Sequence, residues 1–156
     1  ESYNDYEPTR AGRAISNFVN DHLSNWYVRL NRKRFWGGTL TEDKLAAYQT
    51  LYTCLDTISR LMAPISPFYA DRLFLDLNSA TGCDGSESVH LSDFPKADES
   101  LIDKVLEERM QLAQDISSMT LSLRKKENIK VCQPLQQIMV PVLSPLYGLM
   151  PKISRN

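Results

Sequence analysis

The sequence predicts an all-α protein, a helical bundle of four main helices. Apolar residues recur every three or four positions in four separate segments, which is the period of an amphipathic helix. Hydrophobic residues make up 42% of the 156 positions, enough for a core, and the connections between the segments are short. With only 6 Gly and 8 Pro and no fixed repeat, collagen-like and low-complexity chains are excluded.

The first helix is predicted from Pro8 to Trp36. Proline fits the first turn of a helix, where its missing N–H is not needed, and Gly37-Gly38 ends the pattern. The apolar face consists of Ile15, Phe18, Val19, His22, Leu23, Trp26, Tyr27 and Leu30.

A second helix is predicted after Thr41, which is a suitable N-cap because Glu42 and Asp43 follow in the first turn. Its apolar face runs from Leu45 to Met62. Pro64 and Pro67 then interrupt the pattern, and Ser66-Pro67 predicts the start of a third helix that extends to Leu77.

The composition of residues 78–88 predicts an exposed loop, followed by a short extended piece at Val89–Leu91. A fourth, long helix is expected from about Asp98 to about Lys126, with an inner face that includes Leu101, Leu106 and Leu123. All four apolar faces are expected to meet in a common core.

The C-terminal region has a different pattern. Residues 137–142 are β-branched and punctuated by proline, which predicts a short strand, and the tail from Leu143 onward has no clear period. The sequence therefore predicts one helical domain at residues 1–135, followed by a strand and an unassigned tail at residues 136–156.

Charge and cysteine content restrict the class of protein. The 18 Lys and Arg nearly balance the 19 Asp and Glu, so binding to nucleic acid through bulk positive charge is excluded. Three cysteines without a CxxC pair predict neither a disulfide framework nor a zinc site, and reduced thiols suit a cytoplasmic protein. No apolar run is long enough to span a membrane.

No catalytic constellation is evident. The sequence lacks a Gly-rich phosphate loop, GxSxG and HExxH. His22 is expected at the apolar face of the first helix, His90 has no partner at a recognisable spacing, and Cys54 is expected to pack. The sequence therefore predicts no catalytic residues and no metal site.

Two basic clusters stand out from the balanced composition. The first consists of Arg29, Arg32, Lys33 and Arg34, and the second of Arg124, Lys125, Lys126 and Lys130. Both clusters fall at C-terminal ends of predicted helices, where cations also complement the helix dipole, so solubility and dipole pairing are an alternative to ligand binding.

Aromatic residues frame the first cluster. Trp26 and Tyr27 precede it, on the apolar face, where core packing explains them; Phe35 and Trp36 follow it directly. Arginines interleaved with aromatic side chains are typical of surfaces that bind single-stranded RNA, since the flat rings stack on bases and the guanidinium groups contact phosphates.

These residues also carry a family resemblance. The stretch from Leu23 to Trp36 resembles the signature helix of isoleucyl-tRNA synthetases, in the helical anticodon-binding domain that follows the class I catalytic core. The segments 62–68, 88–95 and 123–135 are similar to later motifs of that domain, in the same order. One departure is Cys132, which stands where the family usually has arginine. The resemblance covers about residues 1–142.

The resemblance implies a function and a set of partners. It implies binding of the tRNA(Ile) anticodon stem-loop, with the candidate contacts Arg29, Arg32, Lys33, Arg34, Trp36, Arg124, Lys125 and Lys126. It also implies a larger ligase that joins isoleucine to tRNA(Ile) using ATP and magnesium, with its catalytic and editing domains upstream. The chain itself is then expected to be non-catalytic, without a cofactor, truncated in its first helix and in contact with the catalytic domain of the same polypeptide.

Two alternatives remain at this point. A helical protein-protein interaction module could use the same basic helix ends to bind an acidic protein surface. A sibling synthetase of valyl, leucyl or methionyl type would share the architecture, although the motif from Asn25 to Trp36 favours the isoleucyl type.

Overall fold

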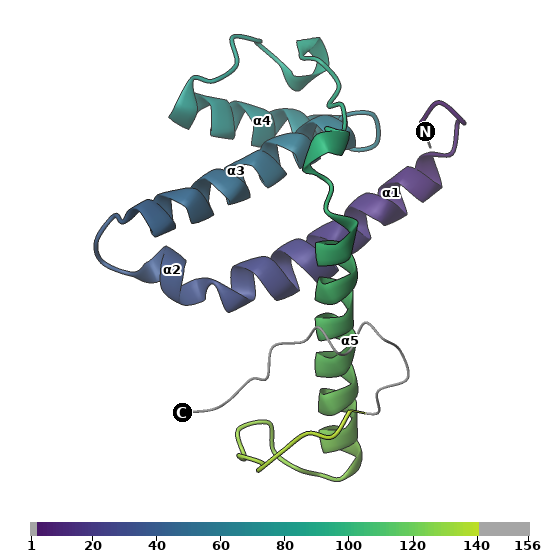
Figure 1. Cartoon of the computed structure of the whole chain (residues 1–156). Coiled ribbons are helices and arrows are strands. Elements are labelled where there is room, and N and C mark those ends of the chain that lie inside the picture. The colour runs from purple at the N-terminus through teal and green to yellow at the C-terminus, as the bar shows by residue number, and fades with distance from the viewer. Residues whose placement is uncertain (1–2, 141–156) are drawn as a thin grey trace. The chain divides into compact units, whose positions relative to one another are not determined.

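The computed structural model describes residues 3–140, and all regular structure within them is helical, as Figure 1 shows. The predicted all-α class is therefore confirmed. The chain divides between Ala97 and Asp98 into two compact units, which we call the first and the second unit. The predicted domain boundary after residue 135 stays a prediction.

The first predicted helix consists of three segments in succession. They are α1 (Pro8–Asn17), the π-helix η1 (Phe18–Val28) and the short helix α2 (Arg32–Trp36). At the end of η1 the backbone N–H of Arg29 donates to the carbonyl of Ser24, five residues earlier. A single continuous helix from Pro8 to Trp36 was therefore wrong: the chain has wider π turns in the middle and a break at Asn31.

The π-helix also explains an error in the predicted apolar face. Because its hydrogen bonds join residues five apart, each turn holds more residues than the 3.6 of an α-helix, and positions rotate away from the expected side. Leu23 is buried as predicted, but His22 is exposed, with its ring 6.2 Å from that of Phe18. Phe18, the first residue of η1, still lines the apolar hollow against α3, although its side chain is 41% exposed.

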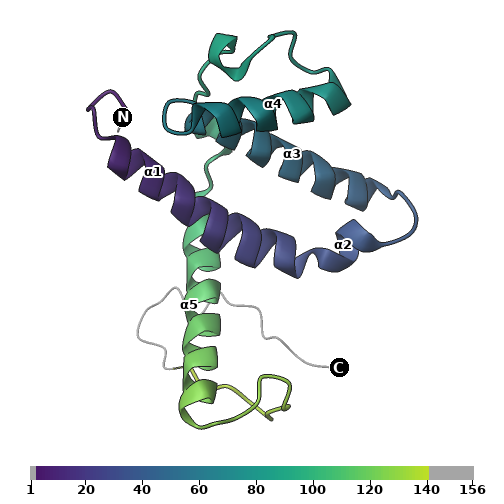
Figure 2. The ribbon, with the colours of Figure 1, turned by 180° about the vertical axis from the view of Figure 1, so that it is seen from behind.

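The helix α3 (Glu42–Met62) forms the centre of the first unit. It runs back beside the α1–α2 segment and lies between that segment and α4, an arrangement visible from both sides in Figures 1 and 2. The Thr41 side chain accepts a hydrogen bond of 3.2 Å from the backbone N–H of Lys44, so the predicted N-cap is confirmed. At the other end, the Tyr3 hydroxyl donates to the carbonyl of Leu61 over 2.7 Å.

The helix α4 (Pro67–Thr81) begins with the proline that predicted it. It continues past Leu77 and ends at Gly82, whose φ of 61° lies in the left-handed region that glycine adopts without steric cost. The Gly82 N–H donates to the carbonyl of Asn78 over 2.7 Å and closes the last turn.

The core of the first unit lies between α3, α4 and a short 3₁₀ turn. Ala70 and Phe74 of α4 are buried together with Val89, and Met62 and Ala63 pack against them. Val89–Leu91 is a 3₁₀ turn (η2), so the predicted extended piece was wrong. The reason is a non-local contact: Asp71 of α4 holds the start of the turn.

Asp71 anchors η2 through two hydrogen bonds. Its Oδ1 accepts from the Ser88 hydroxyl at 2.7 Å and from the Val89 N–H at 3.0 Å, and these bonds lower the pKa of the Asp71 carboxyl, with the Ser88 bond the larger cause. A carboxyl whose pKa is lower in the folded state stabilises the fold above its unfolded pKa, near 3.9, and loses that contribution as the pH falls.

Stability is therefore expected to fall as the pH drops below about 4, in part through Asp71. The variant Asp71→Asn should lose stability at pH 7 and show a shallower decline on acidification. Urea unfolding at pH 7, 5, 4 and 3 measures both effects. A variant with the same acid dependence as the native chain would contradict this role.

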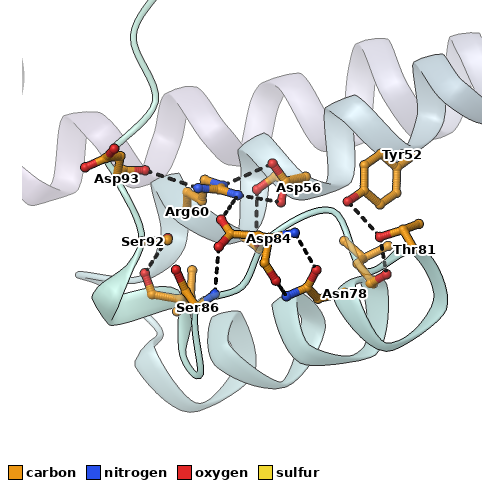
Figure 3. Close-up of polar contacts among 12 residues, drawn as sticks. Tyr52, Asp56, Arg60, Asn78, Thr81, Asp84, Ser86, Ser92 and Asp93 are labelled. Carbon is orange, nitrogen blue, oxygen red and sulfur yellow. Dashed lines mark hydrogen bonds and ion pairs between the residues drawn. The ribbon is translucent and has the colours of Figure 1, made fainter.

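Arg60 connects α3 to the loop that follows α4. Its guanidinium forms ion pairs with Asp56 at 3.0 Å and with Asp84 at 2.8 Å, and it lies over the Phe74 ring, 5.2 Å from the centroid, as Figure 3 shows for the polar contacts. Burial acts to lower the pKa of Arg60, but the hydrogen bonds to Asp56 and Asp84 outweigh it and raise the pKa above its usual value. A fourth contact, to the carbonyl of Asp93, is 3.4 Å long.

The second unit contains a 3₁₀ turn, η3 (Glu99–Leu101), and the long helix α5 (Lys104–Lys126). The predicted start at Asp98 was wrong, because Asp98 caps the 3₁₀ turn and Asp103 caps α5, accepting from the Leu106 N–H at 3.0 Å. No residue of α5 is buried, and Leu106 is 57% exposed, so the expected burial of its apolar face is not observed.

The predicted C-terminal strand is not found. Residues 137–140 have no regular structure, and residues 141–142 lie outside the described part of the chain, as does the unassigned tail from residue 143. The physical reason is that a single β-branched segment has no strand to pair with among the described residues.

Candidate nucleic-acid interface

The first basic cluster lies at the end of η1 and on α2. Arg29, Arg32 and Lys33 are exposed, and none of them forms an ion pair within residues 3–140. Arg29 follows the last turn of η1, and the other two begin α2. Their charges are therefore available to an anionic ligand.

The two aromatic residues after this cluster differ in their surroundings. The Phe35 ring packs inward, with its centroid 6.1 Å from that of Tyr27 and 5.4 Å from that of Tyr48. Trp36 is 80% exposed at the end of α2. The sequence left open whether these two residues pack or contact a ligand. In the structure Phe35 packs, whereas Trp36 exposes its ring on the same short helix as Arg32 and Lys33.

Arg34 is placed differently from its neighbours. Its Nε and Nη2 donate to the two carboxylate oxygens of Asp43 at 2.7 and 2.6 Å, and Nη2 also donates to the Asp43 carbonyl at 3.0 Å. A further bond joins Nη1 to Asn31 Oδ1 at 3.1 Å. The hydrogen bond to Asp43 raises the pKa of Arg34, so the guanidinium is held as a cation inside the protein's own network.

Side chains of α3 hold α2 in place. The Tyr48 hydroxyl donates to the Phe35 carbonyl at 3.0 Å, and Lys44 Nζ donates to the Gly37 carbonyl. These two carbonyls lie at the C-terminal end of α2, where a helix leaves its acceptors unpaired. The preceding segment η1 is also bonded to α3, because the Tyr27 hydroxyl donates to the Ala47 carbonyl at 3.1 Å.

Sequence reasoning missed this set of supporting residues. Asp43 was interpreted only as a favourable charge in the first turn of a helix, Tyr48 only as part of the apolar face of that helix, and Asn31 was given no role. One signal was present, because Arg34 and Asp43 carry opposite charges on the two sides of the Gly37-Gly38 turn. A short turn brings such residues close together.

The second basic cluster lies at the end of α5. The guanidinium of Arg124 donates from Nη1 to the carbonyls of Lys130, Val131 and Gln133, with the shortest bond at 2.8 Å. Arg124 thus holds the returning chain, whereas Lys125 and Lys126 are exposed. Because the two clusters belong to separate units, each is a candidate surface by itself.

A metal site, a membrane-spanning helix or a reactive cysteine would each indicate another kind of function. Within residues 3–140, no group of His, Cys, Asp and Glu side chains is arranged to hold a metal ion, and no helix is long and apolar enough to cross a bilayer. Cys54 lines an apolar hollow of about 390 Å³ between the α1–η1 segment and α3. Burial raises the pKa of the Cys54 thiol, which keeps it protonated and fits the predicted packing role.

The geometry favours a polyanion with exposed bases as ligand. A free indole ring beside unpaired cations can stack on a base while the cations contact the neighbouring phosphates. Because the ring and cations are carried by one short helix that is bonded to α3, they form a compact surface, which we call the α2 surface: Arg29, Arg32, Lys33 and Trp36.

Comparison with known proteins identifies the fold with a family. The family model described as the anticodon-binding domain of tRNA ligase matches residues 1–139. The chain is 71% identical over 140 residues to an isoleucine–tRNA ligase of Bacteroides thetaiotaomicron, which covers 90% of this chain and 12% of the relative. Isoleucine–tRNA ligases of Cytophaga hutchinsonii and Clostridium novyi are 62% and 44% identical, over 93% and 92% of the chain and 13% and 14% of those relatives.

The chain therefore spans about an eighth of the length of these curated relatives. The family-model match and the high identities to these relatives confirm the resemblance inferred from the sequence. This chain belongs to the anticodon-binding domain family of tRNA ligases, with its close relatives among the isoleucine ligases.

Proposed function

We propose that this chain binds the anticodon region of tRNA(Ile) through the α2 surface. The single observation that carries the proposal is the arrangement around Trp36, an exposed indole beside the unpaired cations Arg32 and Lys33. In this arrangement Trp36 stacks on an unpaired base of the anticodon loop, and Arg29, Arg32 and Lys33 contact phosphates or base edges. The family membership supports the class of ligand.

We further propose a subsidiary contact at the second basic cluster. Lys125 and Lys126 are exposed at the C-terminal end of α5 and can contact the RNA backbone. Arg124 shares this cluster, but its bonds to three backbone carbonyls make it the anchor of the loop that follows. The lysines then contribute affinity without reading the sequence of the RNA.

The parent protein is proposed to be a ligase that joins isoleucine to tRNA(Ile). The high identity to isoleucine–tRNA ligases supports this, and the chain's share of their length leaves room for a catalytic domain elsewhere. ATP and magnesium would bind in that part of the parent polypeptide. The role of this chain is then to hold the anticodon end while the acceptor end reaches the catalytic site.

The proposal is tested by titrating the full chain with labelled tRNA(Ile) and with a transcript that differs only in its anticodon. The native chain should bind tRNA(Ile) more tightly. Trp36→Ala should weaken binding roughly 5- to 150-fold, because stacking of a base on an aromatic ring contributes about 1–3 kcal/mol. Tyr69→Ala, which removes another exposed aromatic residue of the same unit, is the matched control.

The cations are tested in the same titration over a series of salt concentrations. The slope of log affinity against log salt is negative, and in the variant with Arg32→Gln and Lys33→Gln it should become shallower by about 1.4. Each phosphate contact in a single strand contributes about 0.7 to its steepness. Arg10→Gln removes an exposed cation of α1 and serves as the control. Equal affinity for both transcripts, or an unchanged slope, would contradict the proposal.

A further inference from the structure

We infer that Arg34 is a positioning residue of the α2 surface, acting as a pair with Asp43, and does not contact RNA. This inference rests on the proposed function, because it assigns a role within the same surface. It differs from the sequence-based expectation, in which Arg34 was one of four equivalent cations.

Most of the hydrogen-bond donors of Arg34 are already used within the protein. An arginine side chain has five N–H groups, and the hydrogen bonds to Asp43 and Asn31 occupy four of them. A phosphate would have to displace Asp43 from a two-pronged ion pair, which is the strongest arrangement that arginine forms with a carboxylate. Arg32 and Lys33 face no such competition within the described residues.

The bonds of Arg34 connect three successive segments of the chain. Asn31 lies at the break between η1 and α2, and its Nδ2 donates to the Tyr27 carbonyl at 2.8 Å. Asp43 lies in the first turn of α3. Arg34 therefore ties the end of η1, the helix α2 and the start of α3 together through one side chain.

The short helix α2 needs such a connection to α3. It has five residues, far fewer than the roughly 12–15 that an isolated helix requires in water. Trp36 is its last residue, so the direction of the indole depends on how α2 is held against α3. The bonds from Tyr48 and Lys44 hold the C-terminal carbonyls, and the Arg34–Asp43 pair holds the middle of the helix.

The charge of Asp43 by itself opposes RNA binding. Asp43 is 69% exposed and places a negative charge beside the basic cluster, where it weakens attraction to phosphates. Asp43 is therefore expected to support binding by holding Arg34 and α2 in place, and not through its charge. This leads to an unusual expectation: removing an acid from a proposed RNA-binding surface should weaken RNA binding.

The test compares Arg34→Gln, Asp43→Asn and the double variant of the full chain in titrations with tRNA(Ile) over a series of salt concentrations. Each single variant should weaken binding about two- to fivefold, the range of a well-formed ion pair near the surface. The double variant should bind no more weakly than the singles, because both lose the same interaction, and the salt slope should not change. Arg72→Gln, which breaks an exposed pair with Asp76 on α4, should have no effect.

A direct RNA contact gives the opposite pattern. Arg34→Gln would then make the slope of log affinity against log salt shallower by about 0.7, and Asp43→Asn would leave the affinity unchanged or raise it. Either result would overturn the inference.

A second measurement does not depend on RNA. In a Trp26→Phe background Trp36 is the remaining tryptophan, and its fluorescence anisotropy reports how firmly α2 is held. The anisotropy should fall in Arg34→Gln and Asp43→Asn alike, but not in Arg72→Gln. An unchanged anisotropy would overturn the positioning role, whereas lowered anisotropy together with equal binding of both transcripts would reject only the proposed function.

Discussion

Phe74→Ala is expected to lower the free energy of unfolding of the first unit by about 3–5 kcal/mol. Among residues 3–140, Phe74 is the largest side chain that is fully buried, at 1% exposure, and it packs with Ala70 and Val89 between α3, α4 and η2. Truncation to alanine removes its buried ring and leaves a cavity that rigid helices cannot close. It also removes the aromatic face under Arg60.

Urea unfolding of the full chain, followed by tryptophan fluorescence, measures this effect. Both tryptophans, Trp26 and Trp36, lie in the first unit, so the signal reports that unit. The matched control is Phe68→Ala, the same substitution on the same helix at a position that is 91% exposed. Similar losses in the two variants would show that Phe74 does not form the core. Phe74→Leu should lose less stability and keeps the comparison possible if the alanine variant is unfolded.

Arg60→Met should lower the free energy of unfolding by about 2–4 kcal/mol, between the values for surface and buried ion pairs. The Arg60 side chain is only 17% exposed, and its removal leaves Asp56 and Asp84 without their shared cation. Methionine keeps most of the length and the apolar stem, so the loss reflects the guanidinium. The loop after α4 should also become more accessible, because Arg60 holds both Asp84 and the Asp93 carbonyl.

The control for this prediction is Arg72→Met. Arg72 also pairs with an aspartate, Asp76, but its side chain is 78% exposed, and such pairs contribute at most about 1 kcal/mol. Limited proteolysis at residues 82–88 measures the release of the loop. Equal stability of the two methionine variants would argue that Arg60 is a surface residue in solution.

Local signals explain what the sequence predicted well. Thr41 and Pro67 determine where α3 and α4 begin, because N-caps and first-turn prolines act within a few residues. The basic cluster and its aromatic flank were also recognisable, because they are contiguous in the chain. Which cations are free could not be predicted, since that depends on Asp43 across a turn and on three carbonyls beyond Glu127.

Non-local contacts explain the rest. Arg60 has the appearance of a simple cation in the last turn of a helix, and its partners Asp84 and Asp93 lie 24 and 33 residues away in irregular chain. The 3₁₀ turn at Val89 depends on Asp71 in another helix. The π turns of η1 are invisible to periodicity because the 3.6-residue pattern continues through them in the sequence.

The π-helix has a consequence for how this segment tolerates changes in length. The buried Leu23 fixes the rotation of η1 about its axis, and Asn31 begins the turn into α2. A residue added or removed between these two points would rotate everything beyond it about the helix axis, by about 100° in an α-helical turn and by less in the wider π turns. The nine residues from Leu23 to Asn31 therefore fix an angle by their number: side chains among them can be exchanged, but inserting or deleting a residue would change the direction in which Trp36 faces.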